Sequence, residues 1–480
     1  MRSLLDYLVA KKGVIAALLF TALFAGLALH YLYDENYLVL LAPAALLMMW
    51  LFMLYRDESL ALMALATPFA VDYAIVGNMS LSMPVEPMMI VFTVVFLFQE
   101  MLMHSYDRRV LRHPVSILIL LSLVWMLFTS IVSLKPVESL KYTAVRLWFV
   151  IPFFYATAQS FQKVRHIRLF YWAYAMSLAV IVVITTFKTM ERYGELQMLH
   201  HVMRPFYNDH TAYGCIIALM LPLSAYFVFE PQTKLWKRIV ALSLMLLLLV
   251  GLWLSYCRAA WISVVGALLV YLLVRVGVRL RWLALGAALL LGLFLAFQGD
   301  IMYELGKNKQ DSSFALADQV KSISNISTDA SNLERINRWN SAFRMWREQP
   351  LTGIGPGAYQ FIYGPYQRSD LMTIISTNDG DMGNAHSEYI GPLTEQGIPG
   401  ALLMLAIFVV TFVTGERVYR TALNRRLGHL ALVLAVSLFT YYVHGILNNF
   451  LDTDKLSVPF WAFTAAIVAL DIVTEKKPCN

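Results

Sequence analysis

The stretch RIVALSLMLLLLVGLWLS, residues 238–255, carries a single charged side chain, Arg238, at its first position. A helix needs about 20 predominantly apolar residues to cross a bilayer, and in lipid its backbone groups must bond to one another. The stretch therefore predicts a membrane-spanning helix. Comparable runs lie near residues 13–33, 37–55, 59–77, 85–103, 114–134, 138–158, 167–188, 211–229, 259–278, 282–298, 388–414, 428–446 and 457–473. Together they predict an all-α, polytopic bundle of about 12–14 transmembrane helices.

The composition supports this fold class. Hydrophobic residues make up 59% of the 480 residues and charged residues 14%, whereas about 25% of residues are charged in soluble domains. The net charge of +7 comes from Lys and Arg spread over short loops, so it indicates topology, and we expect no nucleic-acid partner. Cys215, Cys257 and Cys479 have the spacing of neither a zinc site nor a disulfide framework. No cleavage site follows the first apolar run, which predicts an uncleaved span.

The connecting loops alternate in charge. Those expected on the side of the N-terminus are basic, at residues 107–112, 163–168, 234–238, 275–281 and 417–426, and so is the tail. Because basic loops stay in the cytoplasm, both termini are expected there and residues 299–385 outside. The chain then divides into N-terminal transmembrane helices (1–200), core transmembrane helices with outer-face arginines (201–298), a large outer loop containing helices (299–385) and C-terminal transmembrane helices (386–480).

The outer loop has an ordered pattern. Ser331 and Glu334 form a capping box that opens a helix, whose apolar stripe runs from Leu333 to Trp346. Arg335 and Arg338 are one turn apart and could bind an anion, although a solvated helix face is the competing reading. The next segment has three glycines at 353, 355 and 357, then Tyr359. Such a turn can hold a ligand with its N–H groups, and Tyr359 could contact a sugar, but structural turns and interfacial aromatics share this pattern.

Three arginines lie at the expected outer leaflet or inside the membrane. Arg204 and Arg258 each precede or begin a span on the outer side, and Arg146 falls near the middle of the sixth span. A buried arginine pairs, lines a cavity or binds an anion, and its planar guanidinium suits the oxygens of a diphosphate. Snorkelling to the interface remains the alternative for Arg204 and Arg258, and an internal ion pair for Arg146.

A further pattern begins where the outer loop meets the next span. His386 and Ser387 are followed by Gly397 and Gly400. On one helix, His386 and Gly397 would share a face about 16 Å apart along the axis. A titratable imidazole at the water-facing end of a span suits proton handling, whereas the two glycines would allow a helix or a lipid to approach closely. The sequence contains no metal-ligand pair, Walker loop or dinucleotide fingerprint, so no cofactor or metal is expected.

These patterns, in this order, resemble the O-antigen ligase and O-antigen polymerase superfamily of bacterial polysaccharide membrane enzymes. The segment with His386, Ser387, Gly397 and Gly400 matches its His-[Asn/Ser/Gln]-x9-Gly-x-x-Gly pattern. The stretch around Arg258 resembles its Ser-Arg-Gly/Ala motif, although two residues separate Ser and Arg here. Similar motifs run from Arg204 to Asn208 and from Arg335 to Gly357. The resemblance covers roughly residues 200–450.

The resemblance implies a metal-independent, inverting glycosyltransferase of the bacterial inner membrane, with its active site on the periplasmic face. The implied partners are an undecaprenyl-diphosphate-linked glycan donor, lipid A-core or another glycan acceptor, and membrane lipids. The reaction expected first is O-antigen ligation to lipid A-core. A repeat-unit polymerase, a lipid-linked oligosaccharide flippase and a non-catalytic tethering protein are the alternatives.

The expected mechanism assigns a role to each candidate residue. Arg204 and Arg258 would stabilise the leaving diphosphate, and His386 would accept the proton of the attacking hydroxyl. Arg146, Arg335, Arg338, Ser387, Tyr359, Gly397 and Gly400 would bind substrate. Glu388 and Glu395 are reserve bases, and Glu388 is expected to face away from His386 on the same helix.

Overall fold

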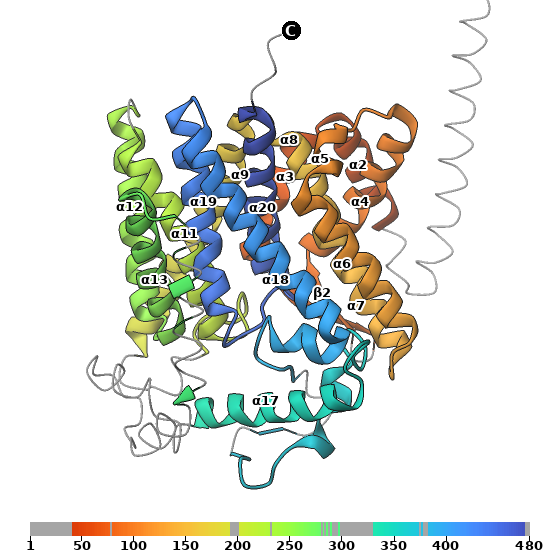
Figure 1. The fold of residues 1–480 in the computed structure, drawn as a ribbon. Helices are drawn as coiled ribbons and strands as arrows, with labels where there is room; N and C mark the ends of the chain where they lie inside the picture. The colour runs from red at the N-terminus through yellow and green to blue at the C-terminus, as the bar shows by residue number, and fades with distance from the viewer. Residues whose placement is uncertain are drawn as a thin grey trace, which may run out of the picture.

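The computed structural model describes residues 41–76, 79–192, 201–230, 233–279, 330–373, 376–377 and 383–475, with single positions between 282 and 297. The spans expected near 13–33 and most of 282–298 lie outside the described residues, as does the first part of the outer loop. The described chain forms a helical bundle with one helix, α17 (Ala330–Glu348), lying across its end (Figure 1).

Within the described residues, nine helices are long and apolar enough to cross a membrane. These helices match nine of the runs expected from the sequence and confirm an all-α, polytopic membrane bundle. They are α4 (Val85–Met103), α6 (Pro114–Ile131), α9 (Val164–Glu191), α11 (His210–Phe229), α12 (Leu235–Leu254), α13 (Arg258–Arg275), α18 (Ile390–Thr421), α19 (Arg425–His444) and α20 (Asp454–Thr474).

Three expected spans differ from single long helices. The first, expected near 37–55, contains the 14-residue helix α2 (Leu41–Leu54) within the described residues. The run 59–77 forms only α3 (Arg56–Ala66) before the chain passes through the 3-10 turn η2 (Thr67–Phe69) into strand β1 (Val71–Val76). Pro68 lacks an N–H group and cannot continue α3, so the prediction of one spanning helix over 59–77 is wrong. Strand β1 pairs antiparallel with β2 (Met79–Met83), with Val71 opposite Met83.

The third of these spans, expected at 138–158, is helical throughout but contains a π-helical segment. Helix α7 (Pro136–Val150) continues through the π-helical segment η3 (Ile151–Ala156) into α8 (Thr157–Ser160). Pro152 lies in η3 and has no N–H to donate along the helix, which fits a local change of hydrogen-bond pattern. A short helix, α5 (Arg108–Arg112), precedes α6.

The centre of the bundle is α20, of whose apolar stretch 89% is buried, compared with 22% for α13. Helices α11, α18 and α19 pack around α20. Helices α12 and α13 keep large apolar side chains exposed, among them Leu246, Trp253 and Val265, as expected for surfaces that face lipid. Helix α20 ends at the end of the bundle opposite α17 (Figure 1).

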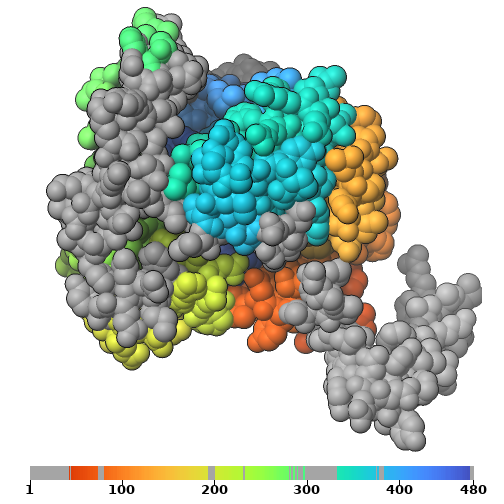
Figure 2. Space-filling model, turned by 90° about the horizontal axis from the view of Figure 1, so that it is seen from below, coloured from red at the N-terminus to blue at the C-terminus, as the bar shows by residue number. Residues whose placement is uncertain are grey.

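Helix α17 and the loop after it cover part of the bundle end (Figure 2) and enclose a small second core. This core contains Ala342, Met345, Ile354, Ala358, Tyr359, Tyr363 and Ala385. The helix lies where the sequence predicts, although it begins at Ala330, before the expected cap Ser331. The expected apolar stripe is not its buried face. Phe343 is exposed, whereas Glu334, Asn337, Arg338 and Ser341 are buried. These polar groups can be buried because they bond to one another and to the following loop.

Candidate functional site

A cavity of about 610 Å³ lies between α7, the start of α11, the β1–β2 hairpin, the segment before α18 and the α19–α20 connection. It is unusually polar for the interior of a membrane bundle, because seven carboxylates line it along with Arg146, Lys455 and His386. The polar and charged side chains of its wall include Asp72, Glu86, Tyr142, Arg146, Asn208, Asp209, Tyr359, His386, Ser387, Glu388, Glu395, Asn448, Asn449, Asp452, Asp454 and Lys455.

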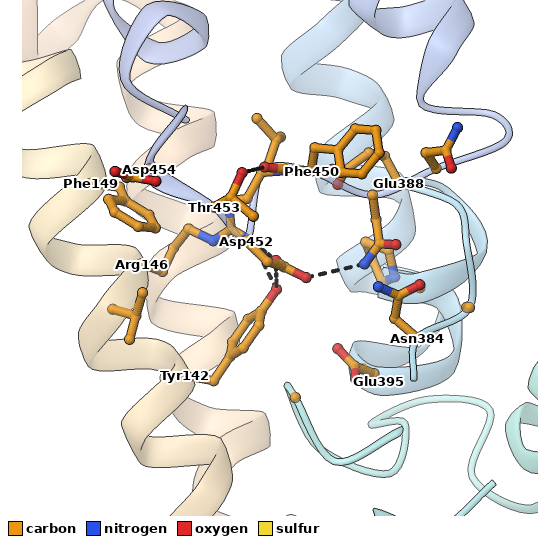
Figure 3. A pocket seen from close by; sticks show the side chains of 18 of the residues that line it. Tyr142, Arg146, Phe149, Asn384, Glu388, Glu395, Phe450, Asp452, Thr453 and Asp454 are labelled. Carbon is orange, nitrogen blue, oxygen red and sulfur yellow. Dashed lines mark hydrogen bonds and ion pairs between the residues drawn. The ribbon is translucent and has the colours of Figure 1, made fainter. Parts of the chain in front are cut away.

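One wall of the cavity is built around Arg146 of α7 (Figure 3). Its guanidinium donates to Asp452 Oδ1 at 2.9 Å, to Tyr142 Oη at 2.8 Å and to the carbonyl of Leu451 at 2.9 Å. Tyr142 Oη also donates to Asp452 Oδ1 at 2.5 Å. Arg146 therefore forms the internal ion pair that was the alternative reading, and its contact with the cavity is made partly through Asp452. The Asp452 side chain keeps 34% of its surface exposed, so it can still meet a ligand.

A second carboxylate of the cavity wall, Glu388, was expected to face away from the site. The chain before α18 is not helical here, and the Glu388 side chain is 3% exposed and lines the cavity. It accepts hydrogen bonds from Tyr441 Oη and from the N–H of Leu451 at 2.9 Å. Burial, reinforced by the negative charge of Asp452, raises the pKa of Glu388 to about 7. Glu388 can therefore exchange a proton near neutral pH.

His386 lines the same cavity but with an unusual backbone. Its φ is 48°, in the left-handed region, and its N–H is held by Asn384 Oδ1 at 3.0 Å. Non-glycine residues in this region are uncommon and cluster at functional sites. Burial together with the charges of Arg335 and Arg338 lowers the pKa of His386 to about 3. The imidazole is therefore neutral at physiological pH, and Glu388 is the better matched proton acceptor.

Ser387 has a structural contact as well as a place in the wall. Its Oγ accepts from the N–H groups of Tyr389 at 3.3 Å and Ile390 at 3.4 Å, where α18 begins. The sequence placed His386 and Gly397 on one helical face, and this is wrong on two counts. His386 precedes the helix, and Gly397 breaks it with φ 69° and ψ −169°.

The break in α18 explains the glycine-rich turn of the outer loop. Pro399 has no N–H, and the kink at Gly397 frees further backbone groups. The N–H of Ile354 donates to Thr394 O at 3.0 Å and that of Gly355 to Glu395 O at 2.9 Å, while the N–H of Ile398 donates to Pro350 O at 3.0 Å. Trp125 Nε1 of α6 bonds Gln396 O at 2.8 Å. These N–H groups of the turn thus bind α18, not a ligand.

The glycines themselves are required for close approach. A Cβ at Gly353 would lie 2.3 Å from the backbone of Glu395, one at Gly355 would lie 1.8 Å from Ser133 Oγ, and one at Gly357 would press on Tyr142. A Cβ at Gly397 would meet the carbonyl oxygen of Leu351 at 2.1 Å. The structural reading of the turn is therefore the one that the contacts support. Gly400 lines the cavity, next to Gln396.

Tyr359, in the 3-10 turn η4 (Tyr359–Phe361), connects the outer segment with the cavity. Its Oη donates to Arg338 O at 2.9 Å, and its ring stacks on Tyr363 with centroids 5.3 Å apart. Its backbone N–H donates to Glu395 Oε1 at 3.2 Å. Tyr359 thus positions the wall carboxylate Glu395 and contributes little open ring surface to a sugar, because its side chain is buried.

The two arginines of α17 have different surroundings. Arg338 is buried, pairs with Glu334 at 2.6 Å and lies 4.1 Å from the centroid of the Tyr363 ring. Arg335 is half-buried and reaches the bundle, where Nε donates to Leu447 O at 3.1 Å. Leu447 adjoins Asn448 of the cavity wall, and the charge of Arg335 acts on His386. Arg335 is therefore beside the cavity, whereas Arg338 holds the outer segment together.

Arg204 and Arg258 are not among the described residues that line the cavity. Arg204 is exposed, and its Nε donates to the carbonyl of Asn208 at 3.3 Å. Arg258 is half-buried and begins α13, next to Cys257, whose Sγ lies 4.0 Å from Thr211 O. Asp209 caps α11 through Thr211 and also lines the cavity. Both arginines thus adjoin the start of α11.

Two parts of the site escaped the sequence reasoning. Asp452, Asn448 and Asn449 fall in the short gap between two spans, a place where polar residues are ordinary. The signal that could have found them is the density of polar groups in a connection this short. The second part is the β1–β2 hairpin with Asp72, where the sequence was read as the end of a span, and the neighbouring Glu86, which was read as part of an outer loop. In the described part of the chain, no group of three His, Cys, Asp or Glu side chains is arranged to hold a metal ion.

Comparison with known proteins agrees with the motifs. No curated protein sequence matches the chain. Residues 242–405 match the family model described as O-Antigen ligase. The matched segment includes Arg258, α17 and the break at Gly397, and these are parts that border the cavity or hold its wall. Over residues 242–405, this multi-pass membrane chain is thus similar to the O-antigen ligase family.

Proposed function

We propose that the protein transfers a glycan from an undecaprenyl-diphosphate carrier to an acceptor at the periplasmic face of the inner membrane, and that the reaction is O-antigen ligation to lipid A-core. The family match supports a membrane enzyme that moves glycans. The observation that carries the proposal is the polar cavity, which is lined by seven carboxylates and Arg146, with Arg204 bonded to its wall residue Asn208 and Arg335 bonded to Leu447 next to its wall residue Asn448. Carboxylates can accept hydrogen bonds from sugar hydroxyls, and guanidinium groups can bind the oxygens of a diphosphate.

The acceptor hydroxyl would enter beside Glu388 and Asp452. Glu388 takes its proton, because its pKa lies near the working pH and its side chain reaches the cavity. Asp452, fixed by Arg146 and Tyr142, accepts a hydrogen bond from a neighbouring hydroxyl and orients the sugar. Neutral His386 adds a hydrogen bond to the same sugar. Attack from the side opposite the leaving group inverts the anomeric carbon.

The diphosphate would leave at the rim formed by Arg204, Arg258 and Arg335. Arg204 donates to the carbonyl of the wall residue Asn208, and Arg335 donates to the carbonyl of Leu447, which precedes the wall residue Asn448. Arg258 follows Cys257, whose Sγ lies 4.0 Å from Thr211 O at the start of α11. Guanidinium groups stabilise the negative charge that develops on the diphosphate, in the way that metal ions do in other transferases, so the proposal needs no metal.

The direct test is transfer by the purified full-length protein in detergent, with undecaprenyl-diphosphate-linked O-antigen as donor and lipid A-core as acceptor. The expected product is glycan-bearing lipid A-core, formed at a rate that a chelator does not change and that Glu388→Gln lowers strongly. A product in which repeat units join on the carrier would instead identify a polymerase. Movement of the intact donor across a vesicle membrane, without any new glycosidic bond, would identify a transporter and overturn the proposal.

A further inference from the structure

A second cavity, of about 530 Å³, lies at the end of the bundle opposite α17. It is enclosed by the start of α9, the end of α11, the start of α12 and the start of α19, at the end of the bundle that Figure 1 shows away from α17. No residue of the proposed transfer site takes part in it. The cavity is therefore separate from that site.

The charged groups of this second cavity favour an anion. Four basic side chains line it, Arg168, Lys234, Lys237 and Arg426, against the single acid Glu230. Glu230 is 5% exposed and already paired with Arg168, and it also accepts from Tyr226. Within the described residues neither lysine makes an ion pair, and Lys237 Nζ lies 5.4 Å from the centroid of the Trp236 ring. The balance of charge at the mouth is thus positive.

The apolar surroundings of the cavity favour an anion with hydrocarbon chains. Trp172, Phe227 and Val240 form part of its wall, and Trp236 at its mouth is 60% exposed. From this point an exposed apolar stripe follows α12 down the bundle at helical spacing, at Leu235, Ile239, Leu242, Leu246, Leu249 and Trp253. A membrane lipid has this shape, with a charged head at the interface and chains that run along the helix.

We propose that this second cavity binds the phosphate headgroup of an anionic glycerophospholipid, whose acyl chains lie along the exposed stripe of α12. Lys234 and Lys237 contact the phosphate, Arg168 is oriented by Glu230 towards the same space, and Trp236 packs against the glycerol. Basic pockets between spans at a membrane surface have the charge and depth that such headgroups require. A free phosphate ion would use the same lysines but not the stripe.

The test uses the full-length protein purified in detergent and native mass spectrometry with phosphatidylglycerol or phosphatidylcholine of identical acyl chains. The protein should bind phosphatidylglycerol in preference. Lys234→Ala with Lys237→Ala should weaken that binding by about thirtyfold, since each lysine near a lipid surface is worth about fivefold in affinity. Lys234→Arg with Lys237→Arg should keep it, because charge is retained. Arg109→Ala with Lys163→Ala is the matched control, as both are exposed basic residues outside the cavity.

Three results would overturn the proposal. Equal binding of the two lipids would show that no headgroup charge is read. Unchanged phosphatidylglycerol binding by the double alanine variant, with the size-exclusion profile of the wild type, would place the lipid elsewhere. Displacement of the lipid by inorganic phosphate would assign the cavity to a free ion. If the alanine variant does not fold, loss of phosphatidylglycerol binding by the folded arginine variant contradicts a charge-reading site.

Discussion

The arginine on α7 and the arginines on α17 are used differently, because Arg146 lines the cavity whereas Arg335 and Arg338 do not. Arg146 is buried inside the bundle and presents a carboxylate, Asp452, to the cavity. Arg338 is equally buried, yet it serves the outer segment by pairing with Glu334 and lying over Tyr363. A buried arginine in a membrane protein therefore does not by itself mark a ligand contact. The carboxylate that it holds, and where that carboxylate points, decides its role.

The largest loss of activity should come from Glu388→Gln, in the cavity wall, and not from changes in the α17 region. If Glu388 accepts the proton, the amide cannot, and the rate of glycan transfer should fall by about 10²–10⁴-fold, the usual contribution of a positioned base. Initial rates on purified protein measure it. Glu348→Gln is the matched control, because Glu348 lies on the exposed side of α17 and bonds Tyr366. A variant of Glu388 with more than half of the normal rate would contradict the assignment.

The α17 region should respond in stability and not in chemistry. Arg338→Ala leaves Glu334 buried without its partner, which costs about 3–5 kcal/mol when a buried pair is broken. We expect a lower melting temperature of the purified protein. After correction for the folded fraction, kcat should be near normal. A stable variant with a large loss of kcat would move Arg338 into the chemical site.

The pH dependence distinguishes Glu388 from His386. The pKa of Glu388 is raised to about 7, and the reactive form is the carboxylate. Transfer should therefore rise about tenfold per pH unit up to about pH 7 and level off above it. His386, with its pKa lowered to about 3, stays neutral throughout and contributes no step in this range. A rising limb that persists in Glu388→Gln, or that disappears in His386→Ala, would reverse the two assignments.

The smallest effect is expected from Tyr142→Phe. It removes one hydrogen bond to Asp452 Oδ1 but leaves the pairing with Arg146 intact. A single hydrogen bond to a charged group contributes about 1.5–3 kcal/mol, part of which Arg146 retains, so we expect a loss of transfer rate of about tenfold. The matched variant is Tyr389→Phe, whose hydroxyl bonds a backbone carbonyl of α19. Equal losses in both would remove Asp452 from the mechanism.

The sequence predicted those features that depend on local composition. Apolar runs located nine spans, and the capping box located α17, because both signals need only neighbouring residues. It failed where long-range contacts decide. The run 59–77 is apolar enough for a span, but its last residues form strand β1 and pair with β2. The buried face of α17 is polar because Glu334 and Asn337 find partners in a distant loop.

The same limit applies to the candidate site. His386, Ser387, Tyr359, Arg146 and Gly400 do line one cavity, and this could be anticipated because the motifs gather at one end of the bundle. The partners of these residues could not be anticipated. Glu388 was read as part of a helix that begins only at Ile390, and Asp452 as part of an ordinary connection. Both come to the cavity through backbone conformations that residue spacing does not encode.

The broken helix α18 has a consequence for protein engineering. Its freed carbonyls at Thr394 and Glu395 are bonded by residues 354 and 355 of the outer segment, and the carbonyl of Pro350 bonds Ile398 in return. The outer segment and the first turns of α18 are thus one cooperative unit. Exchanging the outer segment for that of a related enzyme is one way to change acceptor preference. It should succeed only when the incoming segment continues as one block through residue 399. A junction placed between residues 355 and 394 would take the N–H groups of Ile354 and Gly355 from one protein and the carbonyls of Thr394 and Glu395 from the other, so these backbone hydrogen bonds could be lost.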